Sequence, residues 1–199
     1  PIGLYMALTN PSCDNPQFLE DKDKLRDVAI MTHFTKMAIV SGFAQAFAVF
    51  KCFHSSPGNF DRGSFVRAVI GAGKMGSVYL NDLVTGSDNL DDLGERLGVL
   101  KFWEEYDTAR IISELKGGCY VYESLPFSLM FFVKNPYTID CLYDCVSAGG
   151  DADTNASQVG ALLGALHGES FFPKHLVDGL QERDTIMAVA DKFYSVFRG

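Results

Sequence analysis

The spacing of apolar residues constrains the fold more than any other feature, because it follows a helical period along most of the 199 residues. Between Lys24 and Phe53, apolar residues recur three and four positions apart, with polar residues between them. The apolar–polar alternation of a half-buried strand is almost absent. The sequence therefore predicts an all-α fold.

Capping residues and glycines suggest where the individual helices begin and end. Pro126 is expected in the first turn of its helix. The candidate N-terminal caps are Asn59 or Asp61, Asp88, Asp107, Thr138, and Asp153 or Thr154. The expected helices span residues of about 24–53, 65–83, 90–106, 108–116, 125–133, 139–146, 154–168 and 182–197, with a short helix after Pro173. The paired glycines at 117 and 118 are expected to supply a left-handed helix end.

Composition and charge exclude several classes of protein. Apolar residues make up 47% of the chain, which is enough for one domain with a sizeable core. The net charge of −8 argues against nucleic-acid or anionic-membrane partners, which require clustered Lys and Arg. The most apolar stretch, residues 37–53, is interrupted by Ser41, Gln45 and Lys51, so we expect no membrane span.

The cysteines indicate a reducing compartment. There are five, an odd number, with no C-x-x-C pair and no His at zinc-ligand spacing. This pattern favours reduced thiols over a disulfide framework and therefore a cytoplasmic location. Cys141 and Cys145, four residues apart, are expected to share a buried helix face as small apolar residues.

The segment with the clearest chemical content runs from Ser147 to Ala156 and reads S-A-G-G-D-A-D-T-N-A. Gly149 and Gly150 allow a tight turn, after which Asp151, Asp153 and Thr154 stand at the start of a helix. Carboxylate and hydroxyl oxygens are ligands that Mg²⁺ prefers, whereas the simpler alternative is an Asp cap followed by an exposed Asp. Behind them one small residue per turn is expected to let a neighbouring helix approach closely: Ala156, Gly160, Gly164 and Gly168.

A second glycine motif indicates a different function. Gly71, Gly73 and Gly76 spell G-x-G-x-x-G after an apolar run, which is the fingerprint of dinucleotide-binding oxidoreductases. That interpretation requires a preceding strand and a parallel sheet, whereas residues 64–70 continue a helical pattern. A nicotinamide-dependent oxidoreductase is therefore a remote alternative, and the glycines are expected to permit close helix crossing.

Several segments together resemble the ADP-ribosylglycohydrolase family. The run G-G-D-A-D-T-N-A, followed by G-A-L-L-G-A-L-H-G, is similar to the C-terminal signature of that family. Met31-Thr32-His33 resembles its threonine-histidine helix, and residues 117–126 resemble its glycine loop. Residues 1–4 look like the segment just before the threonine-histidine helix, so the resemblance spans the whole chain.

The resemblance implies a compact orthogonal multi-helix domain that hydrolyses the bond between ADP-ribose and an acceptor, with two Mg²⁺ ions. By that match, the metal ligands are Asp151, Asp153 and Thr154, and the two aspartates are also the catalytic candidates. The residues implied to contact ADP-ribose or an ADP-ribosylated protein are His33, Gly118, Tyr120, Gly149 and Gly150. Thr35 departs from the family, which often has a second His at that position.

The family's N-terminal metal motifs are not found before Pro1. We therefore expect residues 1–199 to be one domain forming the C-terminal two-thirds of a larger one, completed by an N-terminal segment and inactive alone. Three oxygen ligands from one loop are too few to hold two cations against water. The alternative is a family relative without catalysis that binds ADP-ribose or serves a structural role.

Overall fold

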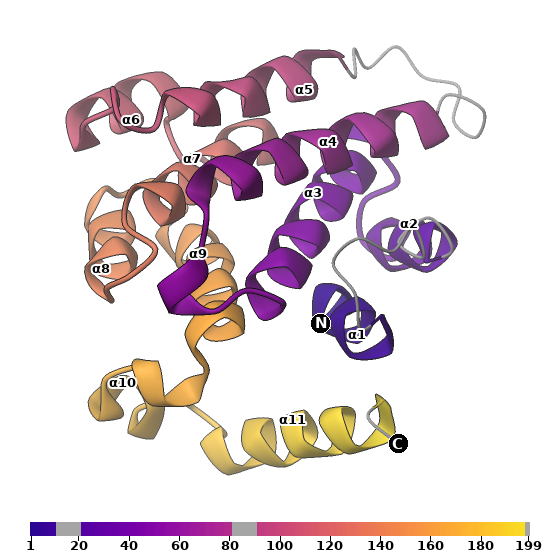
Figure 1. The fold of residues 1–199 in the computed structure, drawn as a ribbon, viewed down its shortest axis with the longest axis vertical. Helices are drawn as coiled ribbons and strands as arrows, with labels where there is room; N and C mark the ends of the chain where they lie inside the picture. Colours follow the sequence, from indigo (N-terminus) through magenta and orange to yellow (C-terminus); the bar gives the residue numbers. More distant parts are fainter. Residues whose placement is uncertain (11–20, 81–90, 198–199) are drawn as a thin grey trace.

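The computed structural model describes residues 1–10, 21–80 and 91–197, and within these ranges it contains helices and no strand. The predicted all-α fold is confirmed (Figure 1). The α-helices are α1 (Ile2–Thr9), α2 (Lys22–Ile30), α3 (Lys36–Phe53), α4 (Arg62–Leu80), α5 (Asp91–Gly98), α6 (Thr108–Leu115), α7 (Val121–Lys134), α8 (Asp140–Ser147), α9 (Ala152–His167), α10 (Lys174–Asp178) and α11 (Arg183–Phe197). Short 3₁₀ helices are η2 (Pro57–Asn59), η3 (Val99–Phe102) and η4 (Glu169–Phe171).

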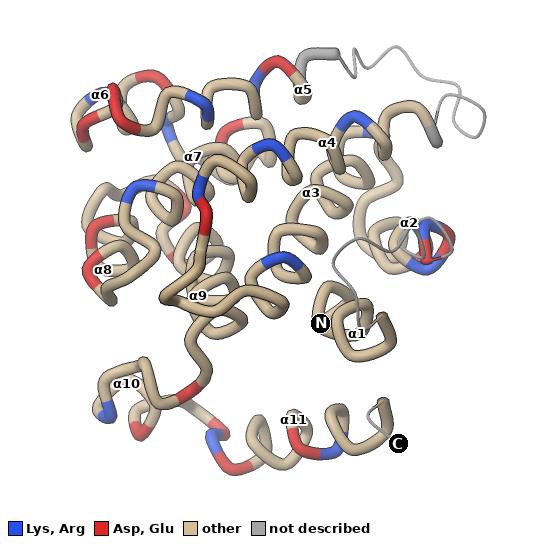
Figure 2. Tube along the Cα trace, viewed as in Figure 1, with Lys and Arg blue, Asp and Glu red and all other residues tan. Residues whose placement is uncertain are grey.

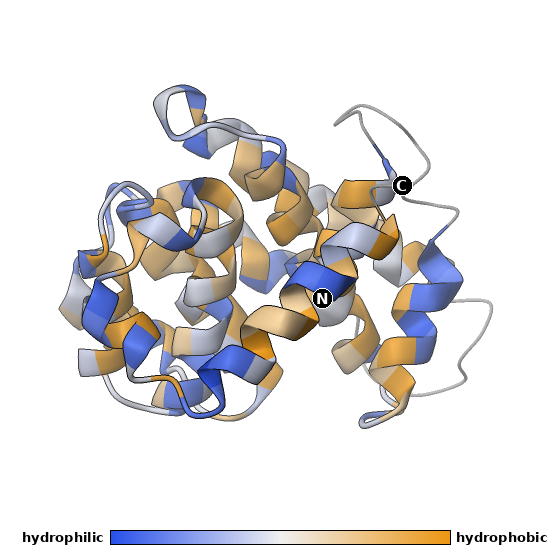
Figure 3. Cartoon of the chain, turned by 90° about the horizontal axis from the view of Figure 1, so that it is seen from below, coloured by the Kyte–Doolittle hydropathy of each residue, from blue (hydrophilic) through white to orange (hydrophobic). Residues whose placement is uncertain are grey.

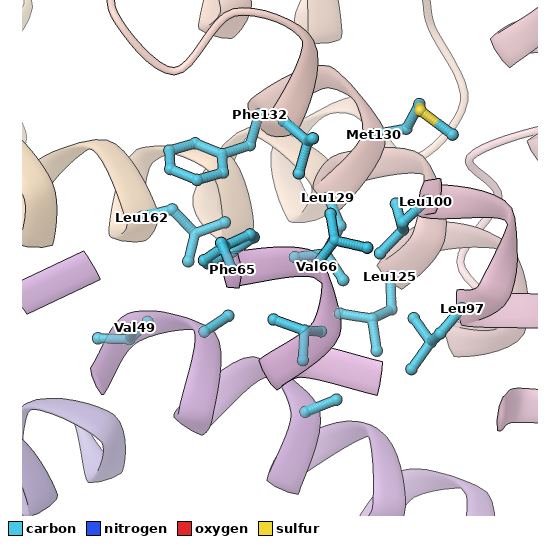
Figure 4. Packing of buried hydrophobic residues seen from close by; sticks show 14 of the residues in the cluster. Val49, Phe65, Val66, Leu97, Leu100, Leu125, Leu129, Met130, Phe132 and Leu162 are labelled. Carbon is cyan, nitrogen blue, oxygen red and sulfur yellow. The ribbon is translucent and has the colours of Figure 1, made fainter. Parts of the chain in front are cut away.

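Helices α3 and α7 form the centre of the molecule. Helix α3 packs against α1, α2, α4, α7 and α9, and every residue of α7 from Ser124 to Val133 is buried. A helix that is apolar all round is stable only when neighbours cover it on every side. Figure 4 shows the result: Phe65 and Val66 of α4 meet Leu129 and Phe132 of α7 in one continuous core.

Charged side chains lie mainly on the outer helices. Figure 2 shows residues of both charges on α2, α6 and α11 and acidic residues on α8, while α1 has none. Helix α3 has the length and mean hydropathy of a membrane span, but 67% of it is buried inside the fold. Burial of this kind is what a central core helix shows, and length and composition alone are weak evidence of a membrane span.

The expected continuous helix from Lys24 to Phe53 is wrong, because it is interrupted at residues 31–35. Thr35 takes an extended conformation and its Oγ1 accepts a hydrogen bond from the N–H of Ala38 at 3.2 Å, so a new helix starts at Lys36. Hydroxyl side chains compete for backbone groups in this way at helix ends. His33 consequently lies in a short link between two helices and not on a helix.

Helix α7 begins at Val121, four residues before the expected start, so Pro126 lies inside it and not in its first turn. Proline has no backbone N–H, so the carbonyl group four residues earlier in the helix loses its hydrogen-bond donor. For Pro126 this carbonyl group belongs to Tyr122. Nε of Arg96 donates to that carbonyl oxygen at 3.4 Å. A side chain from α5 thus takes the role of the missing backbone donor.

Other boundaries agree with the sequence in part. Asp61 and Asp107 cap α4 and α6 through hydrogen bonds from the N–H groups of Ser64 and Arg110. The expected helix of residues 90–106 is shorter, because α5 ends at Gly98 and continues as η3. The expected cap Asp88 and residues 81–83 lie outside the described residues. Thr138 does not cap α8, whose first residue follows Ile139.

Gly71, Gly73 and Gly76 lie in the middle of α4, which no strand precedes in the described part of the chain. The dinucleotide-binding alternative is therefore wrong. A β-carbon at Gly76 would lie 3.3 Å from Cγ of Phe43, and one at Gly73 would lie 3.2 Å from Cδ1 of Leu97. Gly76 and Gly73 thus let α3 and α5 approach α4 closely, as expected, whereas a β-carbon at Gly71 would meet nothing within 4 Å.

The C-terminal helices lie at one end of the molecule. Helix α11 has no buried residue, and it touches α1 where the rings of Phe197 and Tyr5 lie 5.0 Å apart. In Figure 3, which looks from this end, hydrophobic and hydrophilic residues both appear along the C-terminal part of the chain. Cys141 and Cys145 are buried on α8, as predicted.

Candidate functional site

Two turns meet at the start of α9. The first joins α8 to α9 and contains Gly149 and Gly150, with φ values of 81° and 74°. The second joins α6 to α7, and there Lys116 and Gly117 have φ values of 69° and 63°. The left-handed helix end was expected at Gly117 and Gly118, so it lies one residue earlier than predicted.

The carbonyl oxygen of Gly117 is the point where the two turns touch. The N–H of Asp151 donates to it at 2.8 Å. A β-carbon at Gly150 would lie 2.3 Å from the same oxygen, and a β-carbon at Gly117 would lie 2.8 Å from the ring of Phe127. Only glycine fits at 117 and 150, because both positions combine a positive φ with a close neighbour.

Asn155, one helical turn after Asp151, stabilises this contact between the two turns. Its side chain is completely buried, and its Nδ2 donates to the Gly117 oxygen at 2.8 Å. Its Oδ1 accepts a hydrogen bond of 3.2 Å from the hydroxyl group of Ser128 on α7. Three segments of the chain are thereby joined through one amide.

The carboxyl groups of Asp151 and Asp153 lie next to each other. A hydrogen bond with the Asp151 carboxyl group lowers the pKa of Asp153, and the backbone N–H groups of Thr154 and of Asp153 itself lower it further. Oδ1 of Asp153 accepts from the N–H of Thr154 at 2.8 Å. The position at a helix N-terminus also favours negative charge. Asp151, and not Asp153 or Thr154 as expected, is the residue that precedes the first turn of α9, and its side chain makes no capping hydrogen bond.

A cleft of about 580 Å³ opens beside this turn. One wall consists of the link between α2 and α3 together with the first half of α3, and the other consists of the start of α7 and the first turns of α9. His33, Tyr120 and Thr154 are among the residues that line it. The remaining lining is mainly apolar or hydroxyl-bearing, and it contains no Asp, Glu, Lys or Arg from the described part of the chain.

Tyr120 and His33 are presented to solvent at this cleft. The side chain of Tyr120 is 57% exposed, and its ring stacks on that of Tyr122 with centroids 6.1 Å apart. An ordinary buried tyrosine is therefore excluded at position 120. His33 is exposed as well, and its Nδ1 lies 3.1 Å from the hydroxyl oxygen of Thr32.

The cleft also contains two amide oxygens without a hydrogen-bond partner in the described residues, Oε1 of Gln45 and Oε1 of Gln158. Nε2 of Gln45 donates weakly, at 3.4 Å, to the backbone oxygen of Gln158. Buried acceptors of this kind normally bind water or a ligand donor. No local pattern in the sequence pointed to them, since the two residues are 113 positions apart.

The structure brings three of the predicted residues, His33, Tyr120 and Thr154, into one cleft. Asp151, Asp153, Gly118, Gly149 and Gly150 lie beside the cleft without lining it. Sequence reasoning missed the role of Asn155. Asn155 precedes Val159, Leu162 and Leu166 by four, seven and eleven residues, which places it on the buried face of α9. A polar residue on a buried face indicates a specific hydrogen-bonding role.

The small-residue stripe on α9 does not act as predicted. A β-carbon at Gly160 or Gly168 would meet nothing within 4 Å, and one at Gly164 would meet only the ring of Phe172, at 3.6 Å. The neighbouring helices α3, α7 and α8 instead pack on the face that carries Val159 and Leu162. The turn before α9 is held by the Gly117 contact and not by the stripe.

The residues present fit a hard divalent cation in part. Two adjacent carboxyl groups and one hydroxyl group in a single helical turn are the oxygen ligands that Mg²⁺ uses. No group of three or more His, Cys, Asp or Glu side chains gathers within residues 1–10, 21–80 and 91–197. The turn therefore offers a partial ligand set.

Comparisons with known proteins identify the family of the chain. No curated protein matches the chain. The family model described as ADP-ribosylglycohydrolase matches residues 1–199, which include both turns and the whole cleft. Its members are hydrolases of ADP-ribosyl linkages, and the motif resemblance is thereby confirmed. The chain belongs to the ADP-ribosylglycohydrolase family.

Proposed function

We propose that this chain carries one half of a magnesium-dependent site that releases ADP-ribose from an ADP-ribosylated protein. The observation that supports the proposal most directly is the position of Thr154. It belongs to the turn with the two carboxyl groups, and it also lines the 580 Å³ cleft. A cation held by that turn would therefore stand at the edge of a cavity large enough for a nucleotide-sized ligand.

The residues of the cleft have distinct roles in this proposal. The exposed ring of Tyr120 offers a flat surface on which adenine stacks. His33 donates a hydrogen bond to the phosphate–ribose part, with its ring oriented by the Thr32 hydroxyl group. The described lining has no acidic side chain, so no carboxylate there repels the phosphate groups of the ligand.

Asp151, Asp153 and Thr154 would hold the cations. The pKa of Asp153 lies below its ordinary value, so its carboxyl group is ionised at neutral pH, as metal binding requires. Bound Mg²⁺ would supply orientation of the ribose hydroxyl groups, stabilisation of developing negative charge and a more acidic water molecule. The protein's own contribution is to present these oxygens from a turn that two glycines and the Gly117 carbonyl group hold in place.

A single turn does not complete two cation sites. The remaining ligands, which the family resemblance assigns to an N-terminal motif, are not among these 199 residues. We propose that another segment of the protein supplies them, and that the 199-residue chain alone binds Mg²⁺ weakly and shows no turnover.

The second candidate function is ADP-ribose binding without catalysis. The specific observation that favours it is that only two carboxyl groups come together at the turn within the described residues. Under this alternative the cleft still binds ADP-ribose, because Tyr120 and His33 need no metal.

Two measurements on the full-length protein separate the candidates. The first is calorimetric titration with ADP-ribose in the presence and absence of Mg²⁺. The second is release of ADP-ribose from peptides modified on serine or on arginine. The hydrolase predicts metal-dependent binding and release, whereas the binding protein predicts metal-independent binding and no release.

Asp151→Asn is the decisive variant, because it keeps the size of the side chain and removes its charge. It is expected to abolish metal-dependent binding and release. Asp144→Asn is the matched control: Asp144 is an exposed carboxylate on α8 outside the turn and the cleft. Equal activity of both variants would refute the proposed metal site.

A further inference from the structure

A completely buried amide stands directly behind the proposed metal-binding turn, and neither the family resemblance nor the cleft assigns it a role. Asn155 has no exposed surface, so its polar atoms must find partners inside the protein. Both partners are specific: Nδ2 donates to Gly117 and Oδ1 accepts from Ser128. Because a backbone carbonyl oxygen can only accept, Gly117 requires the Nδ2 end of the amide, and Oδ1 is left to accept from the Ser128 hydroxyl group.

The Gly117 oxygen accepts two hydrogen bonds of 2.8 Å, one from Nδ2 of Asn155 and one from the N–H of Asp151. Asp151 and Asn155 are also joined directly, since the N–H of Asn155 donates to the Asp151 carbonyl group at 2.9 Å. These three bonds close a ring around the first turn of α9. The rotation of that turn, and with it the direction of the Asp151 and Asp153 side chains, depends on the ring.

The same oxygen connects the turn to the ligand-binding side of the site. Gly117 precedes Tyr120 by three residues, and the ring of Phe127 on α7 packs against Gly117. The segment that carries Tyr120 is thus held between α7 and the metal-binding turn. Displacing the Gly117 carbonyl group would move the stacking surface and the carboxylates relative to each other.

We infer that Asn155 is a positioning residue, which sets the proposed metal-binding turn at a fixed distance and angle from the Tyr120 segment by holding the Gly117 carbonyl group. This inference rests on the proposed function. Groups that orient metal ligands without touching the metal change metal affinity or activity by about 10- to 100-fold when they are replaced.

The test uses Asn155→Leu in the full-length protein, because leucine is close to asparagine in shape and lacks the donor. Titration with ADP-ribose in saturating Mg²⁺ is expected to show binding about 10- to 100-fold weaker than in the unmodified protein. Ser128→Ala removes the hydrogen bond to Oδ1 and leaves the one from Nδ2 to Gly117, so a smaller loss is expected. It also provides a milder variant should Asn155→Leu fail to fold.

Val159→Ala is the matched control. Val159 lies one turn further along the same buried face of α9, and it takes no part in the ring of hydrogen bonds. The control is expected to lower the unfolding temperature while Mg²⁺-dependent ADP-ribose affinity stays unchanged. Equal losses of affinity in Asn155→Leu and Val159→Ala would show a merely structural role and overturn the inference.

Hydrogen exchange at the Asp151 amide gives a readout that needs neither metal nor ligand. Exchange at this amide is expected to be faster in Asn155→Leu and unchanged in Val159→Ala. If the unmodified protein bound no ADP-ribose, the proposed function would fail, yet the exchange result would still decide whether Asn155 holds the turn. Unchanged exchange together with unchanged binding would overturn the inference alone.

Discussion

Arg96 lies over the ring of Tyr122 and donates from Nε to the carbonyl oxygen of the same residue, with the guanidinium carbon 5.2 Å from the ring centroid. That carbonyl oxygen is the acceptor that Pro126 leaves without a helical donor. Nη2 of Arg96 also donates to the backbone oxygen of Glu114 at 2.7 Å. One side chain thereby joins α5 to the end of α6 and to the start of α7.

Replacing Arg96 with alanine is expected to lower the free energy of unfolding by about 1–2 kcal/mol, because two backbone acceptors lose their donor. Urea denaturation measures the loss. In a Pro126→Ala background the cost of Arg96→Ala should be smaller, since the substituted alanine supplies a backbone N–H to the Tyr122 carbonyl group. Equal costs in both backgrounds would show that Arg96 does not substitute for the missing backbone donor.

Gly150→Ala is expected to disrupt the site, whereas Gly149→Ala is its matched control. Both residues have a positive φ, which costs an L-residue about 1–2 kcal/mol. Only at Gly150 would the β-carbon also meet the Gly117 oxygen, so a loss of at least about 3 kcal/mol is expected there. Denaturation and Mg²⁺-dependent ADP-ribose binding check the pair, and similar values for both variants would contradict the close contact.

Tyr120→Ala is expected to weaken ADP-ribose binding by about tenfold, because base stacking on an aromatic ring contributes about 1–3 kcal/mol. Tyr120→Phe keeps the ring and should bind normally. Tyr143→Ala serves as the control, since Tyr143 is partly exposed on α8 and does not line the cleft. Calorimetric titration distinguishes the three, and normal binding by Tyr120→Ala would exclude stacking.

The thiols should differ sharply in reactivity. Burial raises the pKa of Cys145 to about 12, and burial together with the nearby Cys145 and carboxylates raises that of Cys141 to about 12, so both remain protonated and inert. Cys119 is exposed and lines the cleft. Iodoacetamide at about pH 8 should therefore modify Cys119 in the folded protein and Cys141 only after unfolding.

Peptide mapping by mass spectrometry follows each thiol separately, including Cys13, which lies outside the described residues. Saturating ADP-ribose should slow the modification of Cys119 if the ligand occupies the cleft. Modification of Cys119 at the same rate with and without ligand would place ADP-ribose elsewhere.

A pH dependence is expected from Glu114. Hydrogen bonds from the Tyr106 hydroxyl group and from Arg110 lower the pKa of this carboxyl group in the folded protein. Its contribution is therefore present above the pKa of the unfolded chain, about 4.3, and is lost as the pH falls through the folded pKa. The difference in unfolding temperature between the unmodified protein and Glu114→Gln should be present at about pH 6 and shrink below about pH 4.

Glu104→Gln is the control for this titration, because Glu104 is also exposed and the charge change is the same. Its effect on the unfolding temperature should not follow that of Glu114→Gln. A constant difference for Glu114→Gln across the acid range would contradict the hydrogen bonds to Tyr106 and Arg110.

The sequence predicted those parts of the fold that depend on neighbouring residues. The all-α class, the caps at Asp61 and Asp107 and the glycine turn before α9 follow from local spacing and local backbone preferences. The early start of α7 was not predictable in this way, because the Tyr122 carbonyl group that Pro126 leaves without a helical donor accepts from Arg96, a residue of another helix.

The same limit applies to the site. The residues of the metal-binding turn were identifiable from one short motif, but their arrangement relative to the cleft was not. Gly117 and Asn155 are 38 positions apart, and no local sequence pattern predicts the hydrogen bond between them. Likewise, only the folded chain shows that His33 and Tyr120 line the same cleft.

The burial of α3 has a consequence for how the chain is made. Helix α3 leaves the ribosome long before α9 has been synthesised, and the two meet through residues 113 positions apart. Until then, the face of this long apolar helix that α9 covers stays exposed on the growing polypeptide, even where α1, α2 and α4 already pack on its other faces. Hydrophobic surface that is exposed during folding makes a nascent chain prone to aggregation, and chaperones counteract this. The yield of soluble protein should therefore rise when chaperones are co-expressed.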